Sequence, residues 1–246
     1  MSNARQRALD YALLVLGGLA AWAALAWYAG PEAISTPTQT LTRAFDYLGA
    51  ASFWRHARAT GVAFGWACLL SLAGGALAGL ALGASKLASE VAEPILGTLY
   101  SIPKITLYPI VLLIFGLSLS AKVAFGVLHG FFPVALLTMG AIRNTKQVYL
   151  KTARVLGLTR LQTATTVLLP AILPELVTGL RIGFSSALLG TLVAELFASE
   201  EGLGFMLIRA MEAHKVTDIM ALAFLLFATA TAIGAGLLAV EHRIQK

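Results

Sequence analysis

The chain has 246 residues, of which 58% are hydrophobic and only 12% charged, and its mean hydropathy is +0.81. Because a soluble domain carries about 25% charged residues, this composition excludes an ordinary water-soluble enzyme and instead accommodates about six membrane spans of roughly 20 residues. The formal charge of +6 and the pI near 9.7 therefore indicate the positive-inside bias of membrane proteins rather than nucleic-acid binding.

Charge-free apolar runs mark the predicted membrane spans. Five of them can cross an apolar layer of roughly 30 Å: Tyr11–Ala29, Ala59–Ser85, Ile105–Ala121, Val123–Ile142 and Ile219–Val240. A further span, near Leu173–Leu196, contains Arg181 and carries Glu195 near its end. The sequence thus predicts an all-α fold, a bundle of six transmembrane helices.

The first and third spans have features that the other spans lack. The first has 19 residues without a charge, which is longer than the roughly 7–15-residue core of a cleaved signal peptide, so we expect it to be retained. The third begins before Lys104, because residues 94–102 are also apolar. Its prolines, Pro103 and Pro109, are expected to kink or break the helix.

The loop charges predict an orientation. With the N-terminus inside, cytoplasmic segments hold ten basic residues and outer loops hold four. The ten are Arg5, Arg7, Lys86, Arg143, Lys146, Lys151, Arg154, Arg160, Arg243 and Lys246; the four are Arg43, Arg55, Arg209 and Lys215. This bias predicts a multi-pass membrane protein with both termini in the cytoplasm.

The first outer segment, residues 30–58, contains apolar residues at helical spacing. Leu41, Ala44, Phe45 and Leu48 follow the i, i+3, i+4, i+7 pattern of an amphipathic helix on a membrane surface. We therefore divide the chain into an N-terminal span with this outer segment, residues 1–58, and a core of five spans, residues 59–246.

Small residues recur every four positions in two spans, as Ser71, Gly75, Gly79 and Gly83 and as Gly179, Gly183 and Ala187. Such stripes let helices approach closely. We expect them to pack within the chain, with a subunit interface as the alternative.

The predicted cytoplasmic loop between the fourth and fifth spans reads as a helical hairpin over residues 145–169. Val148, Thr152, Val155 and Leu156 share one helical face, and Gly157 fits a position after a helix end, where a left-handed backbone is required. Thr159 to Gln162 forms a capping box that begins a second helix. That helix must end before Pro170 or bend there. An exposed, ordered hairpin of this kind indicates a contact with a cytoplasmic partner.

Two stretches of this hairpin resemble the EAA loop of binding-protein-dependent ABC importer permeases: KTARVLGLTR at 151–160 and VLLPAILP at 167–174. Further segments resemble the nitrate/sulfonate/taurine branch of that family, among them SIPKI at 101–105, TGLR at 178–181, VAE at 193–195 and GLG at 202–204. The resemblance implies a type I importer permease fold.

The resemblance also implies partners and roles. It predicts a second permease copy, by default forming a homodimer, two cytoplasmic ABC ATPases and an extracytoplasmic solute-binding protein. The residues implied to couple to the ATPase are Lys151, Thr152, Ala153, Arg154, Leu156, Gly157, Leu158 and Thr159. One departure stands out, because Lys151 replaces the Glu that gives the loop its name. A contact that depends on that carboxylate is therefore put in question, and an acidic groove on the ATPase would compensate.

Each charge inside a membrane costs about 2.5–3.5 kcal/mol on insertion scales, so the presence of Lys104, Arg181 and Glu195 within the predicted spans requires an explanation. We predict that these three and Tyr108 line a translocation path for a small, anionic solute of the sulfonate, taurine, nitrate or carboxylate class. The alternatives are that Lys104 caps a kink, that Arg181 snorkels or pairs with Glu175, and that Glu195 is a solvated helix end.

The outer loop over residues 197–218 supplies the remaining candidates. Glu200, Glu201, Gly202 and Gly204 are predicted to contact the binding protein, with a solvated loop as the alternative.

The sequence carries no P-loop, the nearest match being residues 79–86 without an adjacent Gly-Lys pair. It also lacks a Cys or His cluster, since Cys68 is single and the four histidines are scattered. We therefore expect no enzyme activity and no cofactor on this chain, with ATP and Mg on the partner ATPase. An ion-gradient-driven carrier and a non-transporting membrane scaffold remain the alternatives, although no inverted repeat supports the carrier.

Overall fold

The computed structural model describes residues 2–197 and 199–244, and every regular element in them is helical. The long helices are α1 (Ser2–Ala29), α3 (Ala51–Gly83), α6 (Leu119–Arg143), α9 (Leu169–Phe197) and α11 (Val216–Ile244). The shorter elements are α2 (Pro37–Gly49), α4 (Lys86–Ser101), the 3₁₀ turn η1 (Lys104–Leu107), α5 (Tyr108–Phe115), α7 (Gln147–Val155), α8 (Arg160–Gln162), the π-helical segment η2 (Thr163–Leu168) and α10 (Leu203–Glu212).

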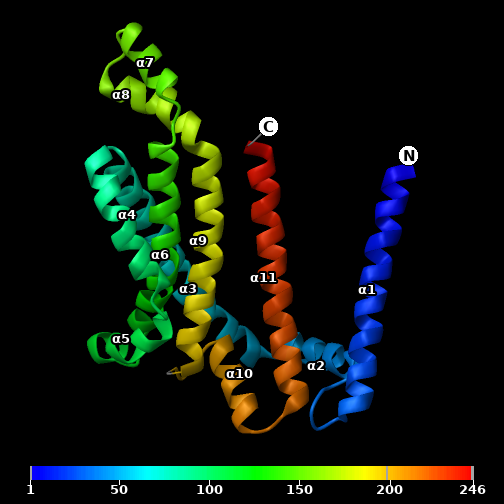
Figure 1. Cartoon of the computed structure of the whole chain (residues 1–246). Helices are drawn as coiled ribbons and strands as arrows, with labels where there is room; N and C mark the ends of the chain where they lie inside the picture. Colours follow the sequence, from blue (N-terminus) through cyan, green and yellow to red (C-terminus); the bar gives the residue numbers. More distant parts are fainter. Residues whose placement is uncertain (1, 198, 245–246) are drawn as a thin grey trace.

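Five helical stretches of the described residues are long and apolar enough to cross a membrane. A sixth crossing results if α4 and η1–α5, which meet at an angle of 83°, count as one broken span. The predicted all-α bundle of six transmembrane segments is confirmed in this sense. Figure 1 shows α3, α4, α6 and α9 gathered in one group, with α11 beside them and α1 standing apart.

The third span differs from its predicted bounds. The span begins before Lys104, as predicted, but its predicted end at Ala121 is wrong: α4 ends at Ser101, the chain turns through η1, and α5 ends at Phe115, before Gly116 with φ +66°. The physical reason lies in the prolines, because the residue before Pro103 is held in an extended conformation and Pro109 fits the first turn of a new helix. The prediction that these prolines interrupt the span is confirmed.

Two other boundaries also differ. Helix α3 begins at Ala51 rather than at Ala59, so it includes Arg55 and Arg58. The helical run that contains the fifth span starts well before Leu173, because α8 and η2 lead directly into α9. Charged residues at a helix end do not stop the helix, so charge-free runs give spans that are too short.

The small-residue stripes pack within the chain. A Cβ on Gly75 would lie 2.8 Å from the Phe131 carbonyl oxygen, and one on Gly79 would lie 2.6 Å from that of Ala135. Both neighbours belong to α6, which packs most extensively against α3 and α9. Gly183 of α9 also packs closely against α6, where the Val134 side chain and the Gly130 carbonyl oxygen lie next to its Cβ position. The expectation of intramolecular packing is thereby confirmed for these residues.

Replacing Gly79 with alanine is expected to lower the melting temperature of the purified protein. The added methyl would press on α6 backbone, and overpacking of this kind costs about 1–3 kcal/mol. Gly65→Ala is the matched control on the same helix, because nothing lies within 4 Å of its Cβ position. Thermal unfolding in one detergent compares the two; equal melting temperatures for both variants would refute close α3–α6 packing.

The predicted amphipathic helix in the outer segment is α2. Thr36 forms a capping box with Gln39 at its start. Arg43 then donates from Nε to Asp218 at 2.5 Å, which ties α2 to the start of α11. This hydrogen bond raises the pKa of Arg43. Helix α2 is thus fastened to the bundle, and its position on a membrane surface remains a prediction.

The two ends of the bundle carry different elements. The described N-terminal end, the end of α11 and the α7–α8 hairpin all lie at one end, whereas α2, α5 and α10 lie at the other (Figure 1). In a membrane that this bundle spans, the hairpin and the 197–218 loop would therefore lie on opposite sides.

Candidate functional site

The predicted hairpin is present in the structure and is locally fixed. Helix α7 ends at Val155 and is followed by Gly157 at φ +67°, and the Leu158 N–H donates to the Ala153 carbonyl at 3.0 Å. Glycine adopts this left-handed geometry without strain. The predicted capping box is also confirmed: the Thr159 N–H donates to Gln162 Oε1 at 2.9 Å, and the Gln162 N–H donates to Thr159 Oγ1 at 3.3 Å.

The second arm of the hairpin does not end before Pro170. The helix instead widens into the π-helical segment η2, where the Leu169 N–H donates to the Ala164 carbonyl, five residues back. A π segment is a common way to accommodate an interruption of the α-helical ladder, and Pro170 supplies one because it has no N–H. The helical run changes direction between α8 and α9 (Figure 1), as the bend alternative expects.

One face of α7 is covered and the opposite face is open. Ala153 is buried, and α7 packs against η2. Val148, Val155 and Leu156 are 57%, 87% and 68% exposed. An open apolar face on a rigid hairpin is a feature of a docking surface.

The eight predicted coupling residues therefore divide into two groups. Lys151, Thr152, Arg154 and Leu156 are exposed on the hairpin. Ala153, Gly157, Leu158 and Thr159 shape it, through the buried contact, the left-handed turn and the cap.

The base of the hairpin is braced against the broken span. Arg143, the last residue of α6, forms a two-point ion pair with Glu93 of α4, with Nη2 3.1 Å from Oε1. A displacement of the hairpin would therefore act on α4, through this ion pair, as well as on α6 and α9.

Lys104 lies at the break between α4 and η1. Its Nζ donates to the Tyr100 carbonyl at 2.8 Å and stands 4.6 Å from the centre of the Tyr100 ring. The Phe132 ring of α6 lies 5.9 Å from the same atom. The ammonium group thus caps the end of α4, where a cation is favoured, and remains partly exposed.

Arg181 of α9 pairs with Glu241 of α11 and not with Glu175. Its Nε lies 2.7 Å from Glu241 Oε2, and Thr178 Oγ1 donates to the other carboxylate oxygen at 2.5 Å. Glu241 is only 5% exposed. The Arg181 charge is therefore balanced by a carboxylate from the neighbouring helix, and the Glu175 alternative is wrong.

Glu195 is completely buried where α3, α9 and α10 meet. The hydroxyl of Thr60 donates to it, with Oγ1 2.8 and 3.0 Å from the two carboxylate oxygens. The Gly204 N–H, in the first turn of α10, donates to Oε2 at 3.0 Å. Carboxylates are favoured at helix N-termini. Such burial does not fit a solvated helix end.

The outer loop has exposed acids and buried glycines. Glu200 and Glu201 are exposed, whereas Gly202 and Gly204 are buried. Gly202 has φ +126°, and its N–H donates to His56 Nδ1 at 3.1 Å. Of the four residues predicted to contact the binding protein, only the two glutamates therefore expose side chains that another protein could contact.

Two further polar contacts complete this end of the bundle. The buried Lys122 of α6 donates to the Glu201 carbonyl at 2.7 Å. The hydroxyl of Tyr108, another predicted path residue, donates to the Ala194 carbonyl at 2.7 Å. Both bonds fasten the helices to one another at the end of the bundle opposite the hairpin.

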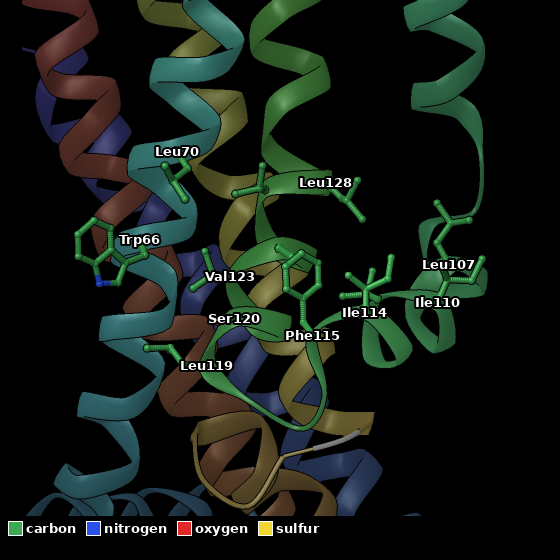
Figure 2. A pocket seen from close by; sticks show the side chains of 13 residues that line it. Trp66, Leu70, Leu107, Ile110, Ile114, Phe115, Leu119, Ser120, Val123 and Leu128 are labelled. Carbon is green, nitrogen blue, oxygen red and sulfur yellow. The ribbon is translucent and has the colours of Figure 1, made fainter.

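One hollow in the described residues is almost entirely apolar. It measures about 780 Å³ and lies between α3, α6 and the η1–α5 segment, where Figure 2 shows Trp66 and Leu70 facing Leu107, Ile110 and Ile114 across it. Ser120 is its one polar lining residue, and none of the four predicted path residues lines it. A hydrated anion would lose its water there without compensation, so this hollow suits hydrocarbon or a protein side chain.

Sequence reasoning missed three partners of the predicted residues, namely Glu241, Thr60 and His56. Glu241 was the easiest to find, because it is a single acid directly after the last apolar run. Thr60 and His56 carry no signal of their own in the sequence. Within the described ranges no three potential metal-ligating residues gather into a site.

Comparisons with known proteins match this architecture. Residues 71–244 match the family described as "Binding-protein-dependent transport system inner membrane component". The chain is 29% identical over 219 residues to the taurine transport system permease protein TauC of Escherichia coli, covering 87% of this chain and 80% of that one. It is 31% identical over 221 residues to the formylaminopyrimidine transport permease protein ThiX of Halalkalibacterium halodurans, covering 89% and 88%.

A solved structure shares the fold. A chain of the MetNI methionine ABC transporter, in an inward-facing conformation, superposes with a TM-score of 0.59 at 20% identity and covers 79% of this chain and 95% of its own length. The fold and hairpin thus define an integral inner-membrane transport permease. The chain belongs to the family of binding-protein-dependent ABC importer permeases, within the branch that includes permeases named for taurine, aliphatic sulfonates and nitrate.

Proposed function

We propose that this chain is the membrane subunit of an ATP-driven importer that passes a small anionic solute into the cytoplasm by alternating access. In this proposal two ATPase subunits, carrying ATP and Mg, dock on the α7–α8 hairpins of two permease copies. An extracytoplasmic binding protein delivers the solute at the opposite end. The rigid, open hairpin is the observation that carries the proposal.

The hairpin supports coupling because it leads directly into the membrane helices. Helix α7 follows α6 after a short turn, and α8 continues through η2 into α9. ATP shifts the conformational equilibrium only if the ATPases favour one permease state over the other. The hairpin is the part of the described chain through which such a preference can reach α6 and α9.

Purification tests this docking directly. The permease, expressed together with a candidate ABC ATPase from the same organism, is expected to yield a stable complex in detergent. Recovery of the permease alone under all conditions, with ion-gradient-driven uptake in liposomes, would support the carrier alternative instead.

A second copy of the chain is the partner we propose within the membrane. Helix α1 stands apart from the bundle (Figure 1), with an apolar hollow of about 520 Å³ between it and α11 that is lined by Trp22 and Phe227, among others. Leu14 and Trp27 of α1 are 74% and 87% exposed. A second copy would cover part of this apolar surface. Cross-linking of single-cysteine variants on α1 tests for the homodimer.

The anionic solute class is proposed from charge and from relatives. TauC is named for taurine and other relatives for sulfonates and nitrate, whereas ThiX is named for formylaminopyrimidine. Among the three charges predicted within spans, Arg181 is paired with a carboxylate and Glu195 is buried in a polar cluster. Lys104 has no carboxylate within 4.0 Å in the described residues and is partly exposed. We therefore place Lys104 on the path, with Arg181 and Glu195 holding the helices around it.

Lys104→Gln is expected to reduce uptake of an anionic solute by about tenfold, the equivalent of roughly 1.4 kcal/mol. The glutamine amide can still donate to the Tyr100 carbonyl, so the variant removes the charge and keeps a cap. Lys104→Arg retains the charge and should retain most uptake. Initial rates of radiolabelled solute uptake compare the three proteins, with basal ATP hydrolysis as the control. Equal rates for Lys104→Gln and the wild type would contradict a role on the path.

We propose that Glu200 and Glu201 contact the binding protein and that both termini lie in the cytoplasm. The second statement is supported by the ten-to-four bias of basic residues and by the position of the hairpin at the same end of the bundle as the start of α1 and the end of α11. Protease protection of terminal tags in spheroplasts tests it; cleavage of either tag from outside would contradict it.

A further inference from the structure

The hairpin carries positive charge without any acid to balance it locally. From residue 143 to residue 172 the sequence has five basic residues and neither aspartate nor glutamate. Arg143 is paired with Glu93. Lys146, Lys151 and Arg154 have no carboxylate within 4.0 Å among the residues that the structure describes. These three cations are exposed.

Lys151 lies in the middle of the open face of α7. Val148, Lys151 and Val155 follow one another at i, i+3 and i+7, which places them on one side of the helix. Ala153 lies on the covered side, against the second arm. We define the docking face as Val148, Lys151, Arg154, Val155 and Leu156. It therefore combines large exposed apolar side chains with two cations.

This combination restricts what can bind. A partner that covers Val155 and Leu156 also removes water from the neighbouring Lys151 ammonium. Desolvating a cation is unfavourable unless a counter-charge replaces the water. Charged groups across an interface are accordingly arranged in complementary pairs. The surface that receives α7 must then offer carboxylates close to Lys151 and Arg154.

We propose that α7 docks into an acidic groove of the partner ATPase, with a carboxylate facing Lys151. The inference rests on the proposed function and adds the chemistry of the partner surface. A hairpin with Glu at this position would require a basic group on the ATPase, whereas Lys151 requires an acidic one. An ATPase that binds such a Glu is therefore expected to bind this permease weakly.

Anionic lipid headgroups are the competing occupant. They attract basic segments next to a membrane, but such attraction requires neither a fixed turn nor a capped helix. The hairpin has both, at Gly157 and Thr159, and it projects beyond the ends of the long helices (Figure 1). A preorganised surface with an apolar centre favours protein docking.

The test measures the affinity of a candidate ABC ATPase from the same organism for permease held in phosphatidylcholine nanodiscs. Lys151→Glu is expected to weaken binding by about tenfold or more, and Lys151→Gln by less. Wild-type affinity should fall as NaCl is raised from 50 to 300 mM, because salt screens the attraction. Lys86→Glu is the matched control, since Lys86 is an exposed cation at the start of α4, outside the hairpin. Circular dichroism and thermal unfolding verify that each variant is folded.

The outcomes are separable. Unchanged affinity for Lys151→Glu overturns the acidic groove while leaving ATPase docking intact. Failure of the wild type to bind the ATPase overturns the proposed function itself. If Lys151→Glu alters only the retention of added phosphatidylglycerol and leaves ATPase affinity unchanged, the hairpin binds lipid and the proposal is wrong.

Discussion

Replacing Gly157 with valine should lower ATP-driven uptake by about 5- to 30-fold while leaving the membrane bundle folded. At φ +67° a β-branched residue is strained by roughly 1–2 kcal/mol, which corresponds to a factor of about 5–30 in the occupancy of the native turn. No atom lies within 4 Å of the Cβ position, so the strain acts through the backbone and reorients α7. Uptake and ATP hydrolysis in proteoliposomes are expected to become uncoupled.

Gly157→Asn is the matched control for this variant. Asparagine tolerates the left-handed region, so the hairpin should retain its geometry and most of its transport. Thermal unfolding should give similar melting temperatures for both variants and the wild type. Normal coupled transport by a folded Gly157→Val protein would contradict a coupling role for the hairpin.

Glu195→Ala is expected to produce the largest loss of stability. The change leaves two buried donors, the Thr60 hydroxyl and the Gly204 N–H, without the acceptor that they now share. Each such group costs about 1–3 kcal/mol. Helix α10 should detach from α3 and α9, and the apparent melting temperature in detergent should fall accordingly.

Two variants separate this effect from a general effect of removing an acid. Glu195→Gln keeps the volume and one acceptor, so its loss should be smaller. Glu200→Ala removes an exposed acid from the adjacent loop and should change stability by no more than about 0.5 kcal/mol. A Glu195→Ala protein that melts with the wild type would show that the buried cluster does not hold α10.

The hairpin could be predicted closely because its signals are local. A capping box spans four residues, and a left-handed turn is indicated by a single glycine. Thr159, Gln162 and Gly157 were therefore enough to predict the turn and the start of the second helix. The helical spacing of Val148 and Val155 likewise identified the open face. The six membrane segments followed from composition, since a membrane span is defined by its own apolar side chains.

The polar contacts inside the bundle could not be predicted in the same way. Glu195 and Thr60 are 135 residues apart in sequence, and Arg181 meets Glu241 only because α9 and α11 lie side by side. The nearer Glu175 was a reasonable but wrong partner for Arg181. Pairings of this kind depend on helix packing, which a single sequence leaves open.

The central claim is that ATP hydrolysis by a docked partner drives transport through this chain. The most direct measurement is solute accumulation in proteoliposomes that contain the permease and a candidate ABC ATPase from the same organism, with a candidate binding protein outside, ATP inside and no ion gradient. We expect accumulation that requires ATP and that Gly157→Val strongly reduces. Accumulation by the permease alone, driven by a proton or sodium gradient without ATP, would contradict the claim.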